Sequence, residues 1–382
     1  MTNNCRKIFV SIGLRYSQYA VAGVLASTTL ASAGILSFTT SHFNQPGDIL
    51  IADQFNNRVV EATPGGNIVW QFGLGPNDFS AKSIIGVNDA QRVGPYTLMA
   101  GTGTPAGVIP QAINGVADNR VILVDPFKRI IWQYGQFGVT GSGPNQLSTP
   151  VQSTWLPNFD VLITDQANNR IIEVNLAKKI VWQYPGSNTN ADQQLSGPNS
   201  AELLENGHVL ISDQGNNRAL EVTHDNNDQV LKTFSAGGTV SIVAFSSRLD
   251  NGDTLLTDSG NARVVEVDPN DNIVWEYDIN TAFPSVPAPL PTRAVRLKNG
   301  DTLISDQFNN RVIEVNMAGG PVMTYGLPLA GGPVGSFPFG NNFGYDTHTT
   351  QNGLYSPYDA KIIGDYTGLT PPFDFDGDAD NQ

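Results

Sequence analysis

One short polar stretch of this sequence combines residue types that could do chemistry. It reads DQFNNRVVEA from Asp53 and DQFNNRVIEV from Asp306. An acid, an amide pair and an arginine this close together could polarise a substrate, but DQANNR, DQGNNR and DSGNAR repeat the pattern elsewhere. A chain does not need one catalytic constellation so often, whereas stacked repeats share the residues that join them. We therefore interpret the motif as structural: its Asn and Asp suit a turn with left-handed backbone, and its Arg and Asp can pair around that turn or with the adjacent repeat.

The motif lies in a repeating unit of four strands. Its arginine recurs at intervals of roughly 45 to 60 residues, the period of β-propeller blades and well above that of leucine-rich repeats. The fourth unit shows its strands as PNSAELLEN, GHVLISD, RALEV and QVLKTF, with Gly, Asn and Asp in the turns. The sequence therefore predicts an all-β fold, a six-bladed β-propeller of four-stranded antiparallel blades, with one motif arginine in each: Arg58, Arg120, Arg170, Arg218, Arg263 and Arg311. Four units also carry a tryptophan that we expect to pack between neighbouring sheets: Trp70, Trp132, Trp182 and Trp275.

The two ends of the repeat region predict a closed ring. The first unit begins at GDILIAD with no inner strand before it, and SPYDAKIIG (356–364) has the pattern of an inner strand left over after the sixth unit. We expect the first blade to take this C-terminal strand, which removes exposed sheet edges. The second unit departs from the pattern, since Gly115 stands where the others have Asp, and residues 101–110 are expected to form a protruding loop.

These residues resemble the NHL-repeat family of β-propellers, whose blades carry a D-x-x-N-x-R-V signature, over about residues 47 to 363. Residues 251–278 are also similar to the propeller repeats of arylsulfotransferase-like proteins. The first resemblance implies a binding platform, or one of a few metal-using lyases. The second implies a histidine before an Asp-Ala pair, where this chain has Asn88 and Tyr358, and its histidines lie at unmatched positions: His42, His208, His224 and His348. We therefore predict no metal site and assign no catalytic residue or cofactor.

If the shared residues build the scaffold, a site is expected where equivalent positions differ between blades. We aligned the inner strands on one small residue each: Ala90, Ser153, Ala201, Ser246, Ala294 and Ala360. The alignment places a variable position near the central channel, occupied by Asp89, Gln152, Ser200, Phe245, Arg293 and Asp359. Its polar members are candidate ligand-binding residues at the channel mouth, for a small polar or zwitterionic ligand. The alternative is an assortment of solvated channel residues.

The chain start has the pattern of an export signal. Basic residues precede a run of small apolar residues and an Ala-Ser-Ala cleavage pattern within residues 1–33, although an uncleaved membrane anchor is the alternative. Either interpretation places the protein outside the cytoplasm, secreted, periplasmic or on the cell surface. The single Cys5 lies in this segment, so the mature chain is expected to have no disulfide. A linker over 34–46 and a propeller over 47–364 are expected to follow.

Residues 365–382 form an acidic C-terminal tail. We expect this tail to be disordered, because it is polar and acidic, although its alternating aspartates also suggest a calcium loop. The 382 residues include 35 acidic and 21 basic side chains, which argues against nucleic acid because phosphate binding needs a concentrated basic surface. The sequence therefore favours an exported binding or scaffold module for a protein, a glycan or a small polar ligand, with membrane contact only if the N-terminal segment is retained. The alternative is a propeller enzyme, arylsulfotransferase-like or a metal-dependent lyase or hydrolase, with its site at the channel mouth.

Overall fold

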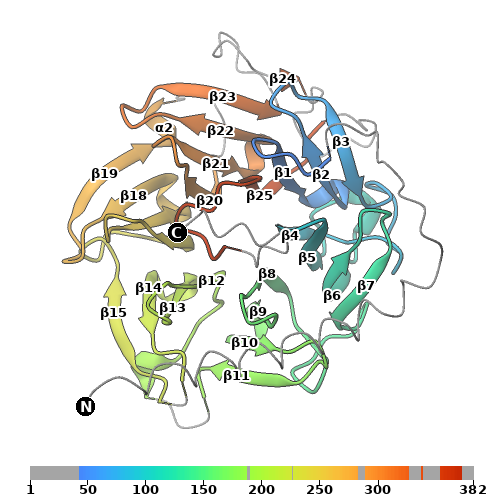
Figure 1. Ribbon diagram of the computed structural model, residues 1–382, viewed down its shortest axis with the longest axis horizontal. Helices are drawn as coiled ribbons and strands as arrows, with labels where there is room; N and C mark the ends of the chain where they lie inside the picture. Colours follow the sequence, from blue (N-terminus) through green and yellow to red (C-terminus); the bar gives the residue numbers. More distant parts are fainter. Residues whose placement is uncertain are drawn as a thin grey trace, which may run out of the picture. The chain divides into compact units, whose positions relative to one another are not determined.

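A computed structural model describes residues 43–186, 190–225, 227–282, 289–326, 337–338 and 353–371. It confirms the predicted all-β fold: six sheets, each with four antiparallel strands and one of them with a short fifth strand, surround one axis (Figure 1). The predicted export signal, most of the linker, His42, His348 and residues 372–382 of the tail lie outside the described residues. No helix among the described residues is both long enough and apolar enough to cross a membrane.

Each blade has its first strand at the axis and its fourth at the rim. Blade 1 contains β25 (Pro357–Ile362), β1 (Ile49–Asp53), β2 (Arg58–Ala62) and β3 (Ile68–Phe72). Blade 2 contains β4 (Val87–Val93), β5 (Tyr96–Thr104), β6 (Val116–Val124) and β7 (Ile130–Gly135), and blade 3 contains β8 (Pro150–Trp155), β9 (Val161–Asp165), β10 (Arg170–Val174) and β11 (Ile180–Tyr184). Blade 4 contains β12 (Ser200–Leu203), β13 (Val209–Asp213), β14 (Arg218–Val222) and β15 (Val230–Phe234), and blade 5 contains β16 (Val243–Arg248), β17 (Thr254–Asp258), β18 (Arg263–Val267) and β19 (Ile273–Asp278). Blade 6 contains β20 (Pro291–Arg296), β21 (Thr302–Asp306), β22 (Arg311–Val315) and β23 (Pro321–Gly326), to which β24 (Phe337–Pro338) adds in parallel.

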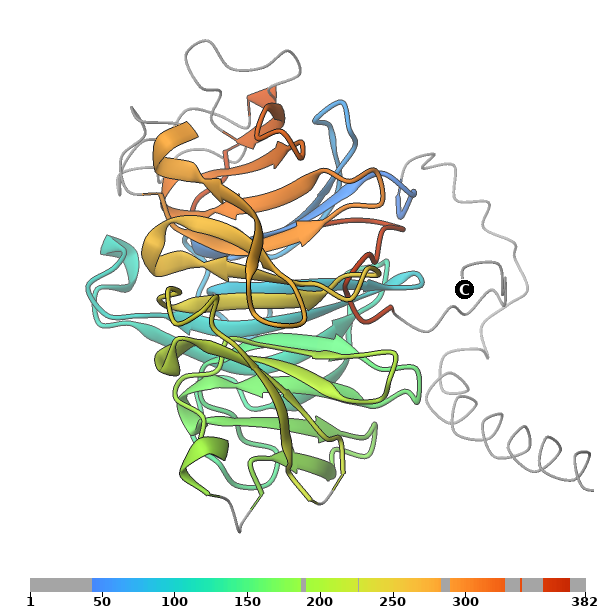
Figure 2. The same cartoon turned by 90° about the vertical axis from the view of Figure 1, so that its left-hand side faces the viewer.

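The ring closes as predicted, because the last strand completes the first sheet. β25 pairs antiparallel with β1, with Ile362 opposite Ile49 and Ala360 opposite Ile51. In the side view the strands of successive blades are stacked one blade next to another (Figure 2). Short helical segments are confined to the connections, namely the helix α2 (Ile279–Ala282) and 3-10 turns at Gln54–Asn56, Pro110–Ala112, Gln166–Asn168, Ala191–Gln193, Gln214–Asn216, Ser259–Asn261 and Gln307–Asn309.

The hydrophobic core lies between neighbouring blades, where β-branched residues of one sheet pack on the next. Trp132 of blade 2, for example, belongs to one cluster with Val161 and Ile172 of blade 3. Its indole Nε1 donates to the carbonyl of Leu176 in the following blade at 3.1 Å. Trp182 and Trp275 make the same bond to the next blade, at 3.0 and 2.9 Å. This confirms the predicted packing of the tryptophans between sheets.

The repeated motif forms the turn between the second and third strands of a blade. In blade 3, Asp165 accepts from Arg170 Nε and from Asn168 Nδ2, both at 2.7 Å. Its other oxygen accepts from the backbone N–H of Ser148, which leads into the inner strand of the same blade, at 2.7 Å. The carboxylate thus holds the turn against the chain segment that enters its own blade, and the predicted pairing of Arg with Asp around the turn is confirmed.

The second Asn of the motif joins one blade to the next. Asn169 lies in the left-handed region, with φ of 52°, which Asn tolerates better than most residues. Its side-chain oxygen accepts from the backbone N–H of Gly197, at the entry of blade 4, at 2.7 Å. The equivalent bonds at four other blade joints run to Gly86, Thr149, Ile242 and Ser356.

The joint between blades 5 and 6 lacks this bond because both of its partners differ. Blade 5 has Ala262 at the position of the bridging Asn, so no side-chain acceptor is present. Pro289, at the position of the residue that donates to the motif Asp in other blades, has no N–H, and the next residue, Leu290, donates to Asp306 instead at 3.0 Å. The two departures from the repeat therefore belong together.

Blade 2 rebuilds the motif with a different aspartate. Gly101, and not Gly115 as expected from the sequence, occupies the position of the motif Asp: it lies opposite Arg120, where Asp53 lies opposite Arg58 in blade 1. Asp118 supplies the missing carboxylate: it accepts from Arg120 Nε at 2.5 Å and from the backbone N–H of Ile85 at 2.7 Å. A Cβ on Gly101 would lie 2.6 Å from Asp118 Oδ2, so the glycine makes room for the substitute carboxylate.

The loop expected over 101–110 is shifted along the chain. Residues 101–104 continue β5, which pairs with β6 as far as Thr104, and the connection covers residues 105–115. Ile109 and Ala112 in this connection are buried against Phe55 of blade 1. The connection is therefore partly a cover over the neighbouring blade rather than a free protrusion.

Candidate functional site

The six inner strands line the propeller axis, and the alignment made from the sequence is in register. In each blade the aligned small residue pairs with an apolar residue of the second strand, as Ala90 does with Met99 and Ala294 with Ile304. The other blades keep the same register. The residue before it, the predicted variable position, therefore occupies one level of the axis in all six blades.

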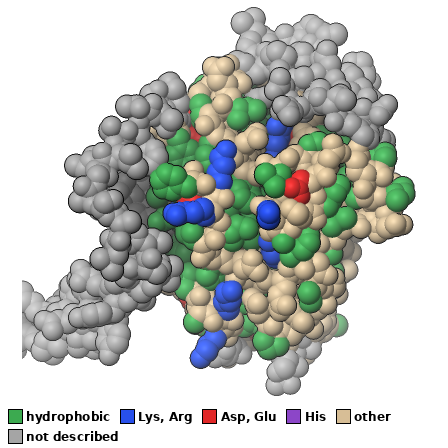
Figure 3. All heavy atoms as spheres, turned by 90° about the vertical axis from the view of Figure 1, so that its right-hand side faces the viewer, with side chains coloured by type: hydrophobic (Ala, Val, Ile, Leu, Met, Phe, Trp, Pro, Cys, Tyr) green, Lys and Arg blue, Asp and Glu red, His purple; other side chains and the backbone are tan. Residues whose placement is uncertain are grey.

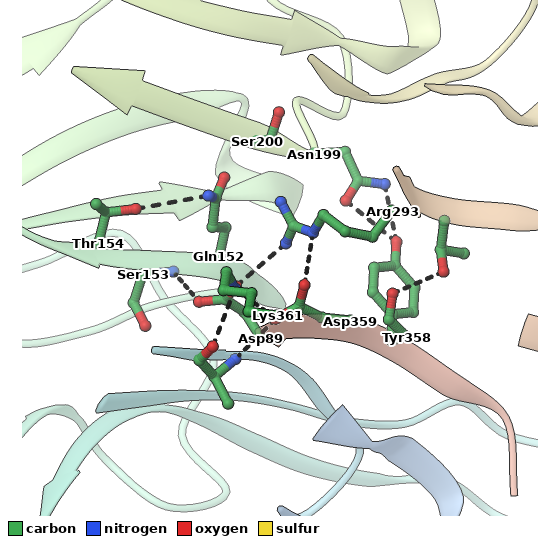
Figure 4. A network of polar contacts seen from close by, with 12 residues as sticks. Asp89, Gln152, Ser153, Thr154, Asn199, Ser200, Arg293, Tyr358, Asp359 and Lys361 are labelled. Atoms are coloured by element: carbon green, nitrogen blue, oxygen red, sulfur yellow. Dashed lines mark hydrogen bonds and ion pairs between the residues drawn. The ribbon is translucent and has the colours of Figure 1, made fainter. Parts of the chain in front are cut away.

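Three side chains at this level and one from the next level form a buried charge cluster, which we call the axial cluster: Asp89, Arg293, Asp359 and Lys361 (Figure 4). Arg293 Nη2 donates to Asp89 Oδ1 at 3.1 Å, and Arg293 Nε lies 2.9 Å from Asp359 Oδ1. Lys361 Nζ lies 2.7 Å from Asp89 Oδ1 and also pairs with Asp359. The Arg293 guanidinium lies 4.0 Å from the centroid of the Phe245 ring, which covers it.

Burial and charge act in opposite directions on these groups. Burial raises the pKa of Asp89, helped by the Asp359 carboxylate and opposed by Lys361 and Arg293. For Asp359 the penalty of burial is outweighed by Lys361 and Arg293, so its pKa lies below its ordinary value. The pKa of Arg293 is raised, because Asp359 and Asp89 outweigh the opposing effect of burial. Arg293 and Asp359 are therefore held as an ion pair, and Asp89 is the acid that takes a proton more readily.

The structure brings all five predicted site residues to the axis but not to an open mouth. Their exposed fraction is 2% or less in every case. Gln152 Nε2 donates to Glu202 at 2.6 Å, and the Ser200 hydroxyl donates to that of Ser212 at 2.7 Å. In the structure these side chains are buried and contact polar neighbours at the axis rather than facing an open, solvated pocket. Their role in binding a ligand stays a prediction.

Three of these side chains also join neighbouring inner strands. Asp359 accepts from the backbone N–H of Ala90 at 3.3 Å, and Asp89 accepts from that of Ser153 at 3.1 Å. Gln152 Oε1 accepts from the N–H of Ala201 at 2.7 Å. Since inner strands of different blades make no sheet with one another, these bonds satisfy backbone donors that would otherwise be buried without a partner.

Glu202 and Lys361, which were not predicted from the sequence, face the axis one level further along. Both lie two residues after the predicted position, where the alternation of a strand returns a side chain to the same face. That alternation was the available signal. Burial raises the pKa of Glu202, and hydrogen bonds from Thr370 oppose the rise.

Residues 363–371 close this end of the axis, although 365–371 were assigned to the tail. Thr370 is 2% exposed; its backbone N–H and its hydroxyl donate to Glu202 Oε2 at 2.8 and 2.6 Å. Gln91 Nε2 donates to the Thr370 carbonyl at 3.3 Å, and Lys298 donates its backbone N–H to Asp365 at 2.7 Å. Between this segment and the axial cluster remains a cavity of about one water molecule in size.

At the opposite end, neutral side chains bridge the blades. Gln307 Nε2 donates to Gln54 Oε1 at 2.6 Å, and Gln54 Nε2 donates to Asn88 Oδ1 at 2.7 Å. Asn199 Nδ2 donates to the Tyr358 hydroxyl at 2.9 Å. Asn88 and Tyr358, which replace the histidine of the arylsulfotransferase-like pattern, are thus occupied by amide partners.

The two described histidines bind glutamates rather than one another. His208 Nδ1 lies 2.8 Å from Glu221 Oε1, and His224 Nε2 lies 2.6 Å from Glu173 Oε2. These contacts hold strands and turns together near the rim. Within the described ranges, no group of three or more His, Cys, Asp or Glu side chains is arranged to hold a metal ion.

Comparison with known proteins yields neither a matching family model nor a curated relative. Similar solved structures include a protein of unknown function from Bacteroides caccae, 15% identical over 73% of this chain and 93% of that one, with a TM-score of 0.49. Virginiamycin B lyase from Staphylococcus aureus is 15% identical over 76% of this chain and 87% of its own, with a TM-score of 0.48. A chain of a nidogen/laminin complex is 10% identical over 72% of this chain and 92% of its own, with a TM-score of 0.48. At these similarities the propeller assignment rests on the strand order and register of this chain.

Proposed function

We propose that this chain is an exported β-propeller that acts as a binding or scaffold module and presents its outer surface to a partner. The observation that carries the proposal is the axial cluster. Arg293, Asp89, Asp359 and Lys361 occupy the axis with mutually compensating charges, and the cavity beside them is about one water molecule in size. A protein or a glycan is therefore bound on the faces or rim, where the turns and connections lie.

Membership of the NHL-repeat family is part of this proposal. It is supported by the roles of the motif residues, which hold each turn to its own blade and each blade to the next, as in Asp165 and Asn169. Export is supported by the basic start and the Ala-Ser-Ala pattern before the propeller. A small polar ligand at Asp89, Gln152, Ser200, Arg293 and Asp359 is the narrower form of the proposal, and it requires rearrangement of the axial cluster.

The test uses the purified full chain and a variant with a neutral axial cluster, Asp89→Asn/Arg293→Met/Asp359→Asn/Lys361→Met, provided that its circular dichroism shows a folded propeller. Capture of an extracytoplasmic protein or glycan by both chains, without turnover of aryl sulfate esters by either, is the expected result. Turnover by the wild-type chain that disappears in the variant would overturn the proposal in favour of an enzyme. Loss of capture in the folded variant would instead support the small-ligand site at the axis.

A further inference from the structure

Among the described residues of this acidic protein, most of the exposed lysine and arginine side chains lie at the rim of blades 2 and 3. The turn between β6 and β7 (125–129) carries Lys128 and Arg129, and the equivalent turn between β10 and β11 (175–179) carries Lys178 and Lys179. All four are exposed. We call these two turns the basic rim. Figure 3, which views the side of β3 and β7, shows Lys and Arg as the predominant charged side chains there.

The fold places the two turns next to each other. The hydrogen bond from Trp132 in β7 to the carbonyl of Leu176 fixes the second turn against β7. Arg129 precedes Trp132 by three residues, about 10 Å along a strand. Lys178 follows Leu176 by two residues, so the positive charges gather over one stretch of the rim.

These cations are available to a partner. No ion pair or hydrogen bond of the described residues engages the side-chain amines of Lys128, Lys178 or Lys179. Arg129 pairs with Asp125 at 2.6 Å, yet its side chain remains 64% exposed. It also lies 5.4 Å from the ring centroid of Phe127, itself 56% exposed. The basic rim therefore combines unneutralised charge with an exposed aromatic ring.

Acidic side chains in the equivalent turns of the next blades limit the extent of the basic rim. The corresponding turn of blade 4 carries Asp225, and the bond from Trp182 to the Asp225 carbonyl fixes that turn against β11. The carboxylates of Asp225 and Asp268 accept hydrogen bonds from their own turns, which lower the pKa of both groups and keep them negatively charged. A broad anionic surface such as a bilayer would meet this negative charge, whereas a single polymer chain can follow the basic strip alone.

We propose that the basic rim binds a linear anionic polysaccharide that carries carboxylate or sulfate groups. Lys128, Lys178, Lys179 and Arg129 pair with its anionic groups, and the Phe127 ring packs against the apolar face of a sugar. This inference rests on the proposed function, because it names the partner of an outer-surface binding module. Being ionic and solvent-exposed, the contact weakens as salt rises.

The experiment measures binding of heparin, a sulfated probe, and polygalacturonate, a carboxylated probe, by calorimetry at low and at high ionic strength. Lys128→Glu/Lys179→Glu is compared with Lys232→Glu/Lys298→Glu, which makes the same change of net charge at exposed lysines on blades 4 and 6. We expect the rim variant to bind at least one probe about tenfold more weakly and the control about as tightly as wild type. All of these side chains are exposed, so unchanged melting temperatures verify folding.

Two results with the polysaccharides would overturn the inference: neither probe binds, or both variants weaken binding equally. It would also be overturned if the wild-type chain binds anionic phospholipid vesicles or duplex DNA more tightly than either polysaccharide and the rim variant loses that binding. A failure here leaves the proposed function standing if the chain captures another partner. Conversely, axis-dependent turnover would remove the proposed function without removing probe binding at the rim. The two ideas can therefore fail separately.

Discussion

The axis and the blade joints use the same residue types in opposite ways. At the joints, Asp, Asn and Arg recur from blade to blade and repeat one set of bonds, as Asp165 and Asp213 both do with the segment that enters their blade. At the axis each blade contributes a different side chain, and Arg293 is bound by Asp89 and Asp359 from two other blades. Repetition thus marks shared geometry. Variation does not by itself mark a ligand site, because unlike residues can bind one another.

The largest expected effect is the loss of the axial cation. Arg293→Met should leave two buried carboxylates with less compensation and cost about 3 to 5 kcal/mol of unfolding free energy, measured by urea denaturation. The quadruple variant that adds Asp89→Asn, Asp359→Asn and Lys361→Met has a neutral axial cluster and should recover part of that loss. A cost below about 1 kcal/mol for Arg293→Met would show that the axis is solvated, and the contrast with the joints would disappear.

A smaller effect on stability is expected from removing the motif arginine, and its size should differ between two blades. Arg311 pairs with Asp306 at 2.7 Å and Arg263 pairs with Asp258 at 2.6 Å, but their side chains are 1% and 15% exposed. Arg311→Ala should therefore cost about 3 kcal/mol and Arg263→Ala about 1 kcal/mol, measured in the same denaturant series. Equal costs would mean that burial does not set the strength of the repeated pair.

The bridging Asn gives a smaller effect with a matched control inside the chain. Asn217→Ala removes the acceptor for the Ile242 N–H and should cost about 1 to 2 kcal/mol. Ala262→Asn adds the same side chain at the joint where the Leu290 N–H is already bound by Asp306, so it should stabilise by less than about 0.5 kcal/mol. A clear gain of stability in Ala262→Asn would contradict this account of the exception.

The smallest effect is a pH dependence at the joint between blades 1 and 2. Burial raises the pKa of Glu61 from 4.5 to about 7 against the attraction of Arg92. Since the folded protein holds this proton more tightly than the unfolded chain, stability from this group is complete below about pH 4.5 and is lost as pH rises toward 7. Melting temperatures across this range should fall less with rising pH in Glu61→Gln than in wild type. Parallel curves for the two proteins would contradict the raised pKa.

The sequence predicted the fold well because the joints repeat. Six arginines gave six blades, and the spare strand at 356–364 gave the ring closure seen in β25. The exchange of Asp for Gly101 and Asp118 in blade 2 was out of reach, because it depends on a carboxylate reaching the same point in space from another strand.

The position of the candidate site was predicted from the sequence, but the burial and mutual pairing of its side chains were not. Alignment gave the level of Asp89 and Arg293 correctly, since register follows from the strand pattern. Whether these side chains meet across the axis depends on how closely six strands converge, which no single strand encodes. Lys361 completes the charge balance and could have been found two residues after Asp359.

The closure of blade 1 by β25 sets a condition on the order of assembly. During synthesis, which starts at the N-terminus, β1 is made long before Pro357–Ile362. One edge of β1 therefore stays unpaired while the other blades are made. Contacts this distant in sequence carry a high entropic cost and form late. Until β25 pairs with β1, the ring is open and exposes unpaired sheet edges. The chain is therefore most prone to aggregation in that interval.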